Sequence, residues 1–224
     1  MKNLIKKKKG CFNTKNITND DLKEYQKFFA FGNPSRYDLF IWVTRQAMPQ
    51  GSGAIAWAAA CASDQYTNRP NLGQINLDTG YFEKWIDNKD IFSSSMSTAV
   101  HELTHLLGFS SKQIPYFINP ETFELRPVTE SVVFGRNGQL RIKTNKVLEV
   151  ARKHFGCPTI SSIGFENGGG KGTKGSHWDR AELGDETMTG SAINDEKYSK
   201  FTLCLLYTSP SPRDATLSRM PSSA

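Results

Sequence analysis

Two histidines stand four residues apart in the segment His101-Glu-Leu-Thr-His105, within a stretch whose apolar residues have helical spacing. Across residues 93–109 apolar side chains recur every three or four positions, which predicts an α-helix with one buried face. One of the serines at 93–95 is expected to cap its start, and Gly108 is expected to end it in a left-handed turn. Because residues four apart lie on the same side of a helix, His101 and His105 can reach one metal ion.

Glu102 directly follows the first of these histidines. A carboxylate in this position can hold a zinc-bound water, remove its proton and later pass that proton to a departing amine. The alternative interpretation is a pair of surface histidines on an amphipathic helix. The apolar face argues against it, because it makes this helix a core element in which buried imidazoles need partners.

A catalytic zinc site needs a third protein ligand. In the pattern H-x-x-x-H-x-x-G-x-x-H a third histidine follows the helix glycine, but here that position is Ser111. The two remaining candidates are His154 and His177. His154 lies on the apolar stripe of a helix predicted over residues 145–155, so we expect it to be a packed core residue. His177 follows a glycine-rich stretch at 167–175, expected to be irregular, and is the predicted third ligand.

Met188 lies eleven residues after His177, between turn-forming residues in the segment Glu186-Thr-Met-Thr-Gly190. In metzincin peptidases a methionine in such a turn lies beneath the zinc. We therefore predict that Met188 forms the hydrophobic floor of the site.

These segments together resemble the leishmanolysin-like surface metalloproteases. In that family a long insertion separates the helix glycine from the third histidine, and here His177 follows Gly108 by 69 positions. The pair Cys157-Pro158 and the segment Arg69-Pro-Asn-Leu-Gly-Gln-Ile-Asn76 also look like family sequence. The resemblance runs over residues 37–205.

The resemblance implies an α+β fold of the metzincin type, with a twisted mixed sheet, an active-site helix and a C-terminal subdomain that is incomplete in this chain. It implies one Zn²⁺ per chain and endopeptidase cleavage of protein or peptide substrates. It also implies an extracellular or membrane-associated location at the cell surface, often with a role in cell adhesion. Cys157 is expected to pair with a cysteine beyond the end of this chain.

Two other interpretations stay open. In a thermolysin-like enzyme the third ligand is a downstream glutamate, and Glu121, Glu124 and Glu130 are available. Gly108 and three prolines in the same region disfavour this, because they make the region a poor helix. Alternatively, the chain is a non-hydrolytic adhesion or binding domain that keeps the fold. The intact Glu102 disfavours that interpretation, since an inactive site has no physical need for a base.

Strands are predicted at residues 38–44, which are rich in aromatic and β-branched residues, and at 74–78, which follow a proline and a glycine. The expected organisation begins with a basic, poorly ordered segment at 1–36 and a catalytic subdomain with the zinc helix at 37–110. An insert and partial C-terminal subdomain with the third ligand and the methionine turn follow at 111–205. The tail at 206–224 is Ser/Pro-rich and is expected to be disordered and non-native.

Composition excludes several other classes of protein. The hydrophobic share of 38% can fill a core, and the apolar stretch at 54–62 is shorter than the ~20 residues of a transmembrane span. The net charge of +6 comes from the terminal segments, and residues 11–205 carry no net charge, so no nucleic-acid partner is expected. The N-terminal lysines are not followed by the apolar run of a signal peptide. The four cysteines form no C-x-x-C pair, which argues against a thiolate zinc site.

Overall fold

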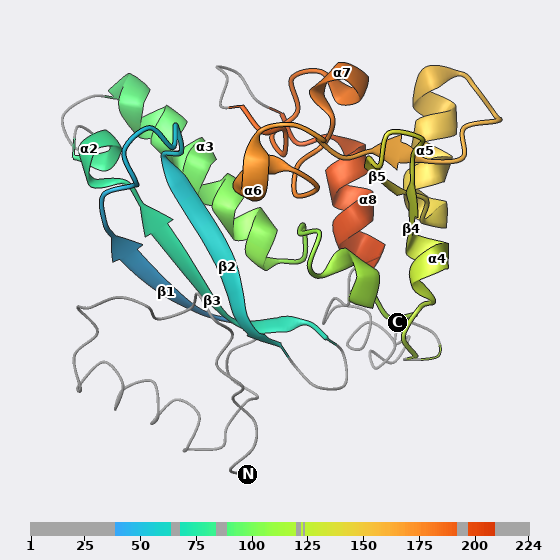
Figure 1. Ribbon diagram of the computed structural model, residues 1–224, viewed down its shortest axis with the longest axis horizontal. Coiled ribbons are helices and arrows are strands. Elements are labelled where there is room, and N and C mark those ends of the chain that lie inside the picture. The colour runs from blue at the N-terminus through green and yellow to red at the C-terminus, as the bar shows by residue number, and fades with distance from the viewer. Residues whose placement is uncertain are drawn as a thin grey trace, which may run out of the picture.

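The computed structural model describes residues 39–63, 68–83, 89–119, 122, 124–191 and 197–208 of the 224-residue chain. A three-stranded sheet and a long helix form one side of the molecule, and a second small sheet with several helices forms the other (Figure 1). The strands are β1 (Phe40–Arg45), β2 (Ala56–Ser63), β3 (Pro70–Leu77), β4 (Val132–Phe134), β5 (Leu140–Ile142) and β6 (Ile163–Gly164). The helices are α2 (Thr79–Phe82), α3 (Lys89–Leu106), the 3₁₀-helix η1 (Ile114–Tyr116), α4 (Val128–Ser131), α5 (Asn145–Phe155), α6 (Gly170–Thr173), α7 (Arg180–Leu183) and α8 (Lys200–Thr208). This agrees with the predicted mixture of α and β structure.

The first sheet has the strand order β1-β3-β2, with β1 parallel and β2 antiparallel to β3. Strands β1 and β3 confirm the two predicted strands, although β3 begins earlier, at Pro70. The sequence does not predict β2, because its run Ala-Trp-Ala-Ala-Ala-Cys-Ala-Ser lacks the alternation of a half-buried strand. Within the described part of the sheet, β2 is an edge strand with a neighbour on one side only.

Helix α3 packs against β2 and β3 and carries His101 and His105 in its C-terminal half. Gly73 of β3 allows this close packing, because a Cβ atom there would lie 2.7 Å from Cδ1 of Leu106. The apolar contact fixes the histidine-bearing end of α3 against the sheet. Figure 1 shows α3 running past the edge of the sheet toward the second half of the molecule.

The C-terminal end of α3 confirms the prediction. The helix ends at Leu106, Gly108 has a positive φ of 128°, and the amide of Phe109 donates to the carbonyl of Thr104 at 3.2 Å. The predicted serine cap is wrong, because α3 already begins at Lys89 and the serines at 93–95 lie inside the helix. Ser94 instead shares a hydrogen bond of 3.0 Å with the hydroxyl of Tyr81 in α2.

The second half of the molecule packs around four fully buried side chains, those of Phe109, Phe165, Trp178 and Met188. The rings of Phe165 and Trp178 stack with centroids 5.0 Å apart. Helix α5 confirms the prediction at 145–155, and Gly156 caps its C-terminal end with a φ of 62°. Helix α8 packs alongside α5, and the antiparallel sheet β4-β5-β6 completes this half.

Two expectations about irregular chain are wrong in part. The glycine-rich stretch at 167–175 contains one helical turn, α6, which the amide of Lys174 closes by donating to the carbonyl of Gly170 at 3.0 Å. The chain also continues to pack after residue 205, because α8 extends to Thr208. Leu206 packs against the core, and Thr208 continues the buried face of α8 that includes Phe201 and Leu205.

The predicted N-terminal segment at 1–36 and residues 209–224 of the predicted tail lie outside the described residues. The subdomain boundary at residue 110 stays a prediction. Of the helices that the structure describes, none combines the length and apolar character required to cross a bilayer.

Candidate metal centre

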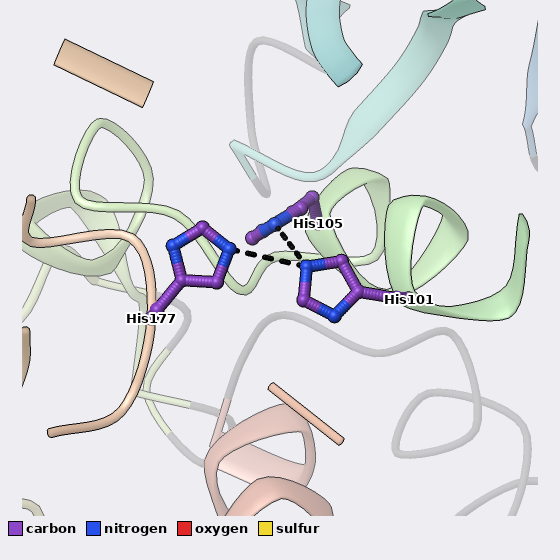
Figure 2. A group of neighbouring side chains, drawn as sticks. All are labelled: His101, His105 and His177. Atoms are coloured by element: carbon purple, nitrogen blue, oxygen red, sulfur yellow. Dashed lines mark hydrogen bonds between the residues drawn. The ribbon is translucent and has the colours of Figure 1, made fainter. Parts of the chain in front are cut away.

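Three imidazoles converge where the two halves of the molecule meet. His101 and His105 come from successive turns of α3, and His177 comes from the segment after α6 (Figure 2). Nε2 of His101 lies 3.1 Å from Nε2 of His105 and 3.1 Å from Nε2 of His177. Across the described parts of the chain, this is the one cluster of three or more His, Cys, Asp or Glu residues able to hold a metal ion, and its ligand atoms lie within 4.8 Å of one another.

The other ring nitrogen of each histidine is hydrogen-bonded to a backbone carbonyl. The acceptors are Thr187 for His101 (2.6 Å), Phe109 for His105 (2.7 Å) and Thr173 for His177 (3.0 Å). Because a carbonyl oxygen can only accept, each Nδ1 carries the proton and each Nε2 keeps a free lone pair. Three lone pairs therefore face one another, an arrangement that a cation between them would stabilise and that is repulsive without one.

The acceptor for His105 is built by the end of its own helix. The turn at Gly108 reverses the chain and brings the carbonyl of Phe109 back over the last turn of α3. The acceptor for His177 is the last residue of α6, Thr173. Its side chain packs so closely on Gly190 that a Cβ atom at position 190 would overlap the Thr173 methyl group.

Burial shapes the titration of all three imidazoles. Desolvation, followed by the charge of neighbouring His177, lowers the pKa of His101 to about 4. Desolvation likewise lowers the pKa of His105 well below its ordinary value, with contributions from His101 and His177, and lowers the pKa of His177. The metal-free cluster is therefore neutral at pH 7, which is the form in which imidazole binds metals.

Glu102 lies beside this cluster and lines the same cavity. Only 7% of its surface is exposed, and burial raises the pKa of its carboxyl group to about 8. A nearby cation would oppose this shift by favouring the carboxylate. The pKa of Glu102 therefore depends on whether a cation is bound to the three histidines.

The cavity above the histidines has a volume of about 770 Å³. One wall is the edge strand β2 with the loop before it, at residues 52–60, and the other wall includes residues 110–113 and 189–191. A cavity of this size between two walls can hold several residues of an extended chain.

Met188 is fully buried in the core of the second half, one residue after the carbonyl that accepts from His101. Its own carbonyl accepts from the backbone amide of Trp178 at 2.8 Å, and Trp178 directly follows His177. The turn that contains Met188 is thus bonded to the segments of two of the three histidines.

The other candidate ligands lie elsewhere. His154 is exposed, so the expectation of a packed core histidine is wrong; it lies in the last turn of α5, beyond the last buried position, and its ring contacts Phe155 and Phe201. Glu124 and Glu130 are exposed and do not belong to the cluster, and Glu121 lies outside the described residues.

Sequence reasoning missed the three carbonyl acceptors and the wall formed by β2. Backbone carbonyls carry no residue-type signal, so Phe109, Thr173 and Thr187 do not stand out in the sequence. The one usable signal is glycine, since Gly108 and Gly190 mark places where the backbone must turn or approach closely.

The mixed α/β fold and the histidine cluster are consistent with a metallopeptidase. Residues 19–208 match the family model described as Leishmanolysin, which covers most of the chain. The chain therefore belongs to the leishmanolysin family, as the sequence motifs indicated.

Curated relatives agree with this assignment. The chain is 28% identical to a leishmanolysin-like peptidase of Caenorhabditis elegans, with 88% of this chain and 33% of the relative covered. It is 29% identical to a leishmanolysin homolog of Crithidia fasciculata and 28% identical to leishmanolysin of Leishmania major, each over 70% of this chain. Those two matches cover 22% and 24% of the relatives. The chain thus spans a third or less of the length of these proteins.

Proposed function

We propose that this chain carries the catalytic centre of a zinc-dependent endopeptidase of the metzincin type. The observation that carries the proposal is the convergence of the Nε2 atoms of His101, His105 and His177, with each Nδ1 anchored to a carbonyl. Family membership supports the reaction class, because the matching family consists of peptidases.

The donor set fits zinc. Imidazole nitrogens are common zinc ligands at about 2.0–2.1 Å, so tetrahedral coordination requires neighbouring ligand nitrogens about 3.3 Å apart. The two distances of 3.1 Å from Nε2 of His101 are close to this requirement. Three protein ligands leave one position open, which is the arrangement of catalytic rather than structural zinc sites. One zinc ion per chain, held by the three histidines, is therefore the proposed cofactor.

Zinc at this position would supply a Lewis acid and a water of lowered pKa. Glu102 is the proposed general base: its carboxylate accepts the proton of the attacking water and then donates that proton to the departing amine nitrogen. Burial alone favours the protonated form of Glu102, and the charge of a bound cation would counteract it, which would favour the carboxylate that a general base needs. The anchored imidazoles hold their positions throughout, and Met188 is the proposed hydrophobic floor beneath them.

Protein or peptide chains are the proposed substrates, bound in an extended conformation along β2. Residues 56–60 of this strand line the cavity that contains the histidines and Glu102. Because β2 has a neighbour on one side only in the described sheet, its other edge can pair with the backbone of a substrate strand. Such pairing would hold a scissile peptide group beside the metal without requiring a particular side chain.

We also propose an extracellular or cell-surface location and a role in cell adhesion, on the basis of family membership. The state of Cys61, which is disulfide-bonded, supports this, because stable disulfides form in oxidising compartments. Cys157 and Cys204 are free thiols in the structure, so the expected pairing of Cys157 stays a prediction.

A cleavage assay on the full 224-residue chain tests the function. The zinc-loaded chain should cleave denatured casein, lose this activity with 1,10-phenanthroline and regain it with added zinc. The variant Glu102→Ala should bind zinc with the stoichiometry of the parent and lose cleavage by at least about 100-fold. Cleavage by Glu102→Ala at the parent rate would contradict the mechanism. Zinc binding by the parent chain without turnover would favour the adhesion or binding alternative.

A further inference from the structure

Glu186 is a buried carboxyl group that the proposed reaction does not use. Only 3% of its surface is exposed, and it forms no ion pair with the described residues. Its Oε1 accepts from the amide and hydroxyl of Ser199, at 3.0 and 2.9 Å, and from the hydroxyl of Thr202. Its Oε2 accepts from the backbone amide of Met188. Four hydrogen bonds thus compensate for the burial of this group.

All four partners act as donors. The two backbone amides can only donate, and the hydroxyl of Thr202 already accepts from the indole Nε1 of Trp178 at 2.8 Å, so its own proton points to Glu186. The site therefore requires two acceptor oxygens, which a carboxylate supplies. A glutamine could keep its oxygen toward Ser199 and Thr202 only by turning its NH₂ group against the amide of Met188, which is also a donor.

The amide of Met188 belongs to the same peptide group as the carbonyl of Thr187. That carbonyl accepts from Nδ1 of His101 at 2.6 Å. One planar peptide unit is therefore held on its N–H side by the carboxylate of Glu186 and binds the imidazole on its C=O side. A charged acceptor on the N–H both fixes the plane and polarises the carbonyl, which strengthens the bond to the imidazole and raises the basicity of the opposite ring nitrogen.

The other oxygen of Glu186 links this peptide unit to the N-terminal part of α8. Ser199 directly precedes α8 and Thr202 lies in its first turn, where it bonds the indole of Trp178, the residue after His177. The same carboxylate thus ties the support of His101 to the segment that carries His177.

We propose that Glu186 is a positioning residue for the metal centre, acting on His101 through the Thr187–Met188 peptide group. The inference rests on the proposed zinc site for its functional meaning. It predicts that removing the charge from Glu186 weakens metal binding even where the chain remains folded.

The test compares Glu186→Gln with the control Glu182→Gln in the full chain. Glu182 is also a partly buried carboxylate, bonded to Arg141 at 2.6 Å and to the amide of Gly164 at 2.9 Å, but neither bond reaches a peptide group that binds a histidine. We expect Glu186→Gln to weaken zinc affinity, measured by chelator competition, by about 10- to 100-fold. Glu182→Gln should remain within about threefold of the parent while losing stability.

A second readout uses the metal-free chain. In NMR spectra of the histidine rings, the Nδ1 proton of His101 should exchange slowly with water in the parent and in Glu182→Gln, and at least about tenfold faster in Glu186→Gln. Unchanged zinc affinity together with unchanged exchange in a folded Glu186→Gln variant would overturn the inference. If the parent chain binds no zinc, the proposed function fails, and the exchange measurement still decides the role of Glu186.

Should Glu186→Gln not fold, Thr202→Val replaces it. This substitution keeps the size of the side chain and removes both a donor to the carboxylate and the acceptor of the Trp178 indole. We expect a loss of zinc affinity of about three- to tenfold and faster exchange at His101. Parent values for both quantities in folded Thr202→Val would overturn the inference.

Discussion

The carbonyl oxygen of Thr187 lies 2.6 Å from Nδ1 of His101, although the two residues are 86 positions apart in the chain. This bond joins the histidine-bearing helix of the first half of the molecule to the methionine turn of the second half. The orientation of His101 therefore depends on how the segment after residue 180 packs, and not on α3 alone. The histidine cluster is therefore built by the contact between the two halves of the molecule.

The first prediction concerns the identity of the third ligand. His177→Ala should reduce zinc affinity by more than about 100-fold, because it removes one of three ligand atoms rather than a supporting bond. Glu130→Ala should bind zinc like the parent, since Glu130 is exposed and lies outside the cluster. His154→Ala is the matched histidine control, because His154 is exposed on α5. Zinc stoichiometry after dialysis, measured by atomic emission, distinguishes these variants.

A parent-like zinc content in His177→Ala, combined with loss of zinc in Glu130→Ala, would restore the thermolysin-like alternative. Loss of zinc in all three variants would point to a general failure of folding, and circular dichroism of the metal-free proteins checks for that.

The second prediction concerns the contact between Gly190 and Thr173. Gly190→Ala should place a methyl group against the methyl of Thr173, whose carbonyl accepts from Nδ1 of His177. We expect a loss of about 1–3 kcal/mol in the free energy of unfolding and weaker zinc binding. Adding Thr173→Ser removes the opposing methyl group and should recover most of both losses. The measurements are urea denaturation and chelator competition.

Gly172→Ala is the control for this pair, because a Cβ atom at that position meets no atom within 4 Å. It should change stability and zinc affinity little. If Gly190→Ala and Gly172→Ala behave alike, the close approach of Gly190 to Thr173 does not position His177.

The sequence predicted the parts of this site that depend on residue type and regular spacing. His101, His105 and Glu102 follow from one helical turn, and His177 follows from the small number of histidines left to choose from. The strands and helix with strong apolar patterns also formed where expected, at β1, β3 and α5.

What the sequence did not predict depends on backbone geometry or on the surrounding structure. The alanine-rich strand β2 has no periodicity of its own and becomes a strand by pairing with β3 and packing on α3. The start of α3 was misplaced because serines favour caps locally, whereas here the helix continues through them. The support of each imidazole by a carbonyl depends on long-range packing, as between His101 and Thr187.

The third prediction is that the metal-free chain is most stable near pH 6.5. The lowered pKa values of the three histidines, about 4 for His101, mean that the unfolded chain binds protons on these residues first as the pH falls below their ordinary value of 6.5. Unfolding then takes up protons, and stability falls toward pH 4. Each histidine contributes at most about 1.4 kcal/mol per pH unit.

Glu102 produces the alkaline side of the same profile. Burial raises the pKa of its carboxyl group from an ordinary 4.5 to about 8, so between these values the folded chain holds a proton that the unfolded chain has released, and this contribution to stability falls with rising pH until it levels off above 8. Between pH 6.5 and 8 the stability of the parent should therefore fall, whereas Glu102→Gln should be nearly flat. Urea denaturation at pH 5, 6.5 and 8.5 measures both sides. If the free energy of unfolding falls equally between pH 6.5 and 8.5 in the parent and in Glu102→Gln, Glu102 is not the cause of this fall.

The fourth prediction concerns the packing of α3 against the sheet at Gly73. In Gly73→Ala the new methyl group would lie within 2.8 Å of both Cδ atoms of Leu106, a side chain that is 1% exposed and cannot move into solvent. We expect a loss of about 1–3 kcal/mol in the free energy of unfolding, because overpacking forces α3 away from β3. Shortening the partner in Gly73→Ala/Leu106→Val should recover part of the loss, although Leu106→Val alone should be destabilising. Urea denaturation of the three variants forms a double-mutant cycle, and additive effects in that cycle would show that the two side chains do not compete for the same space.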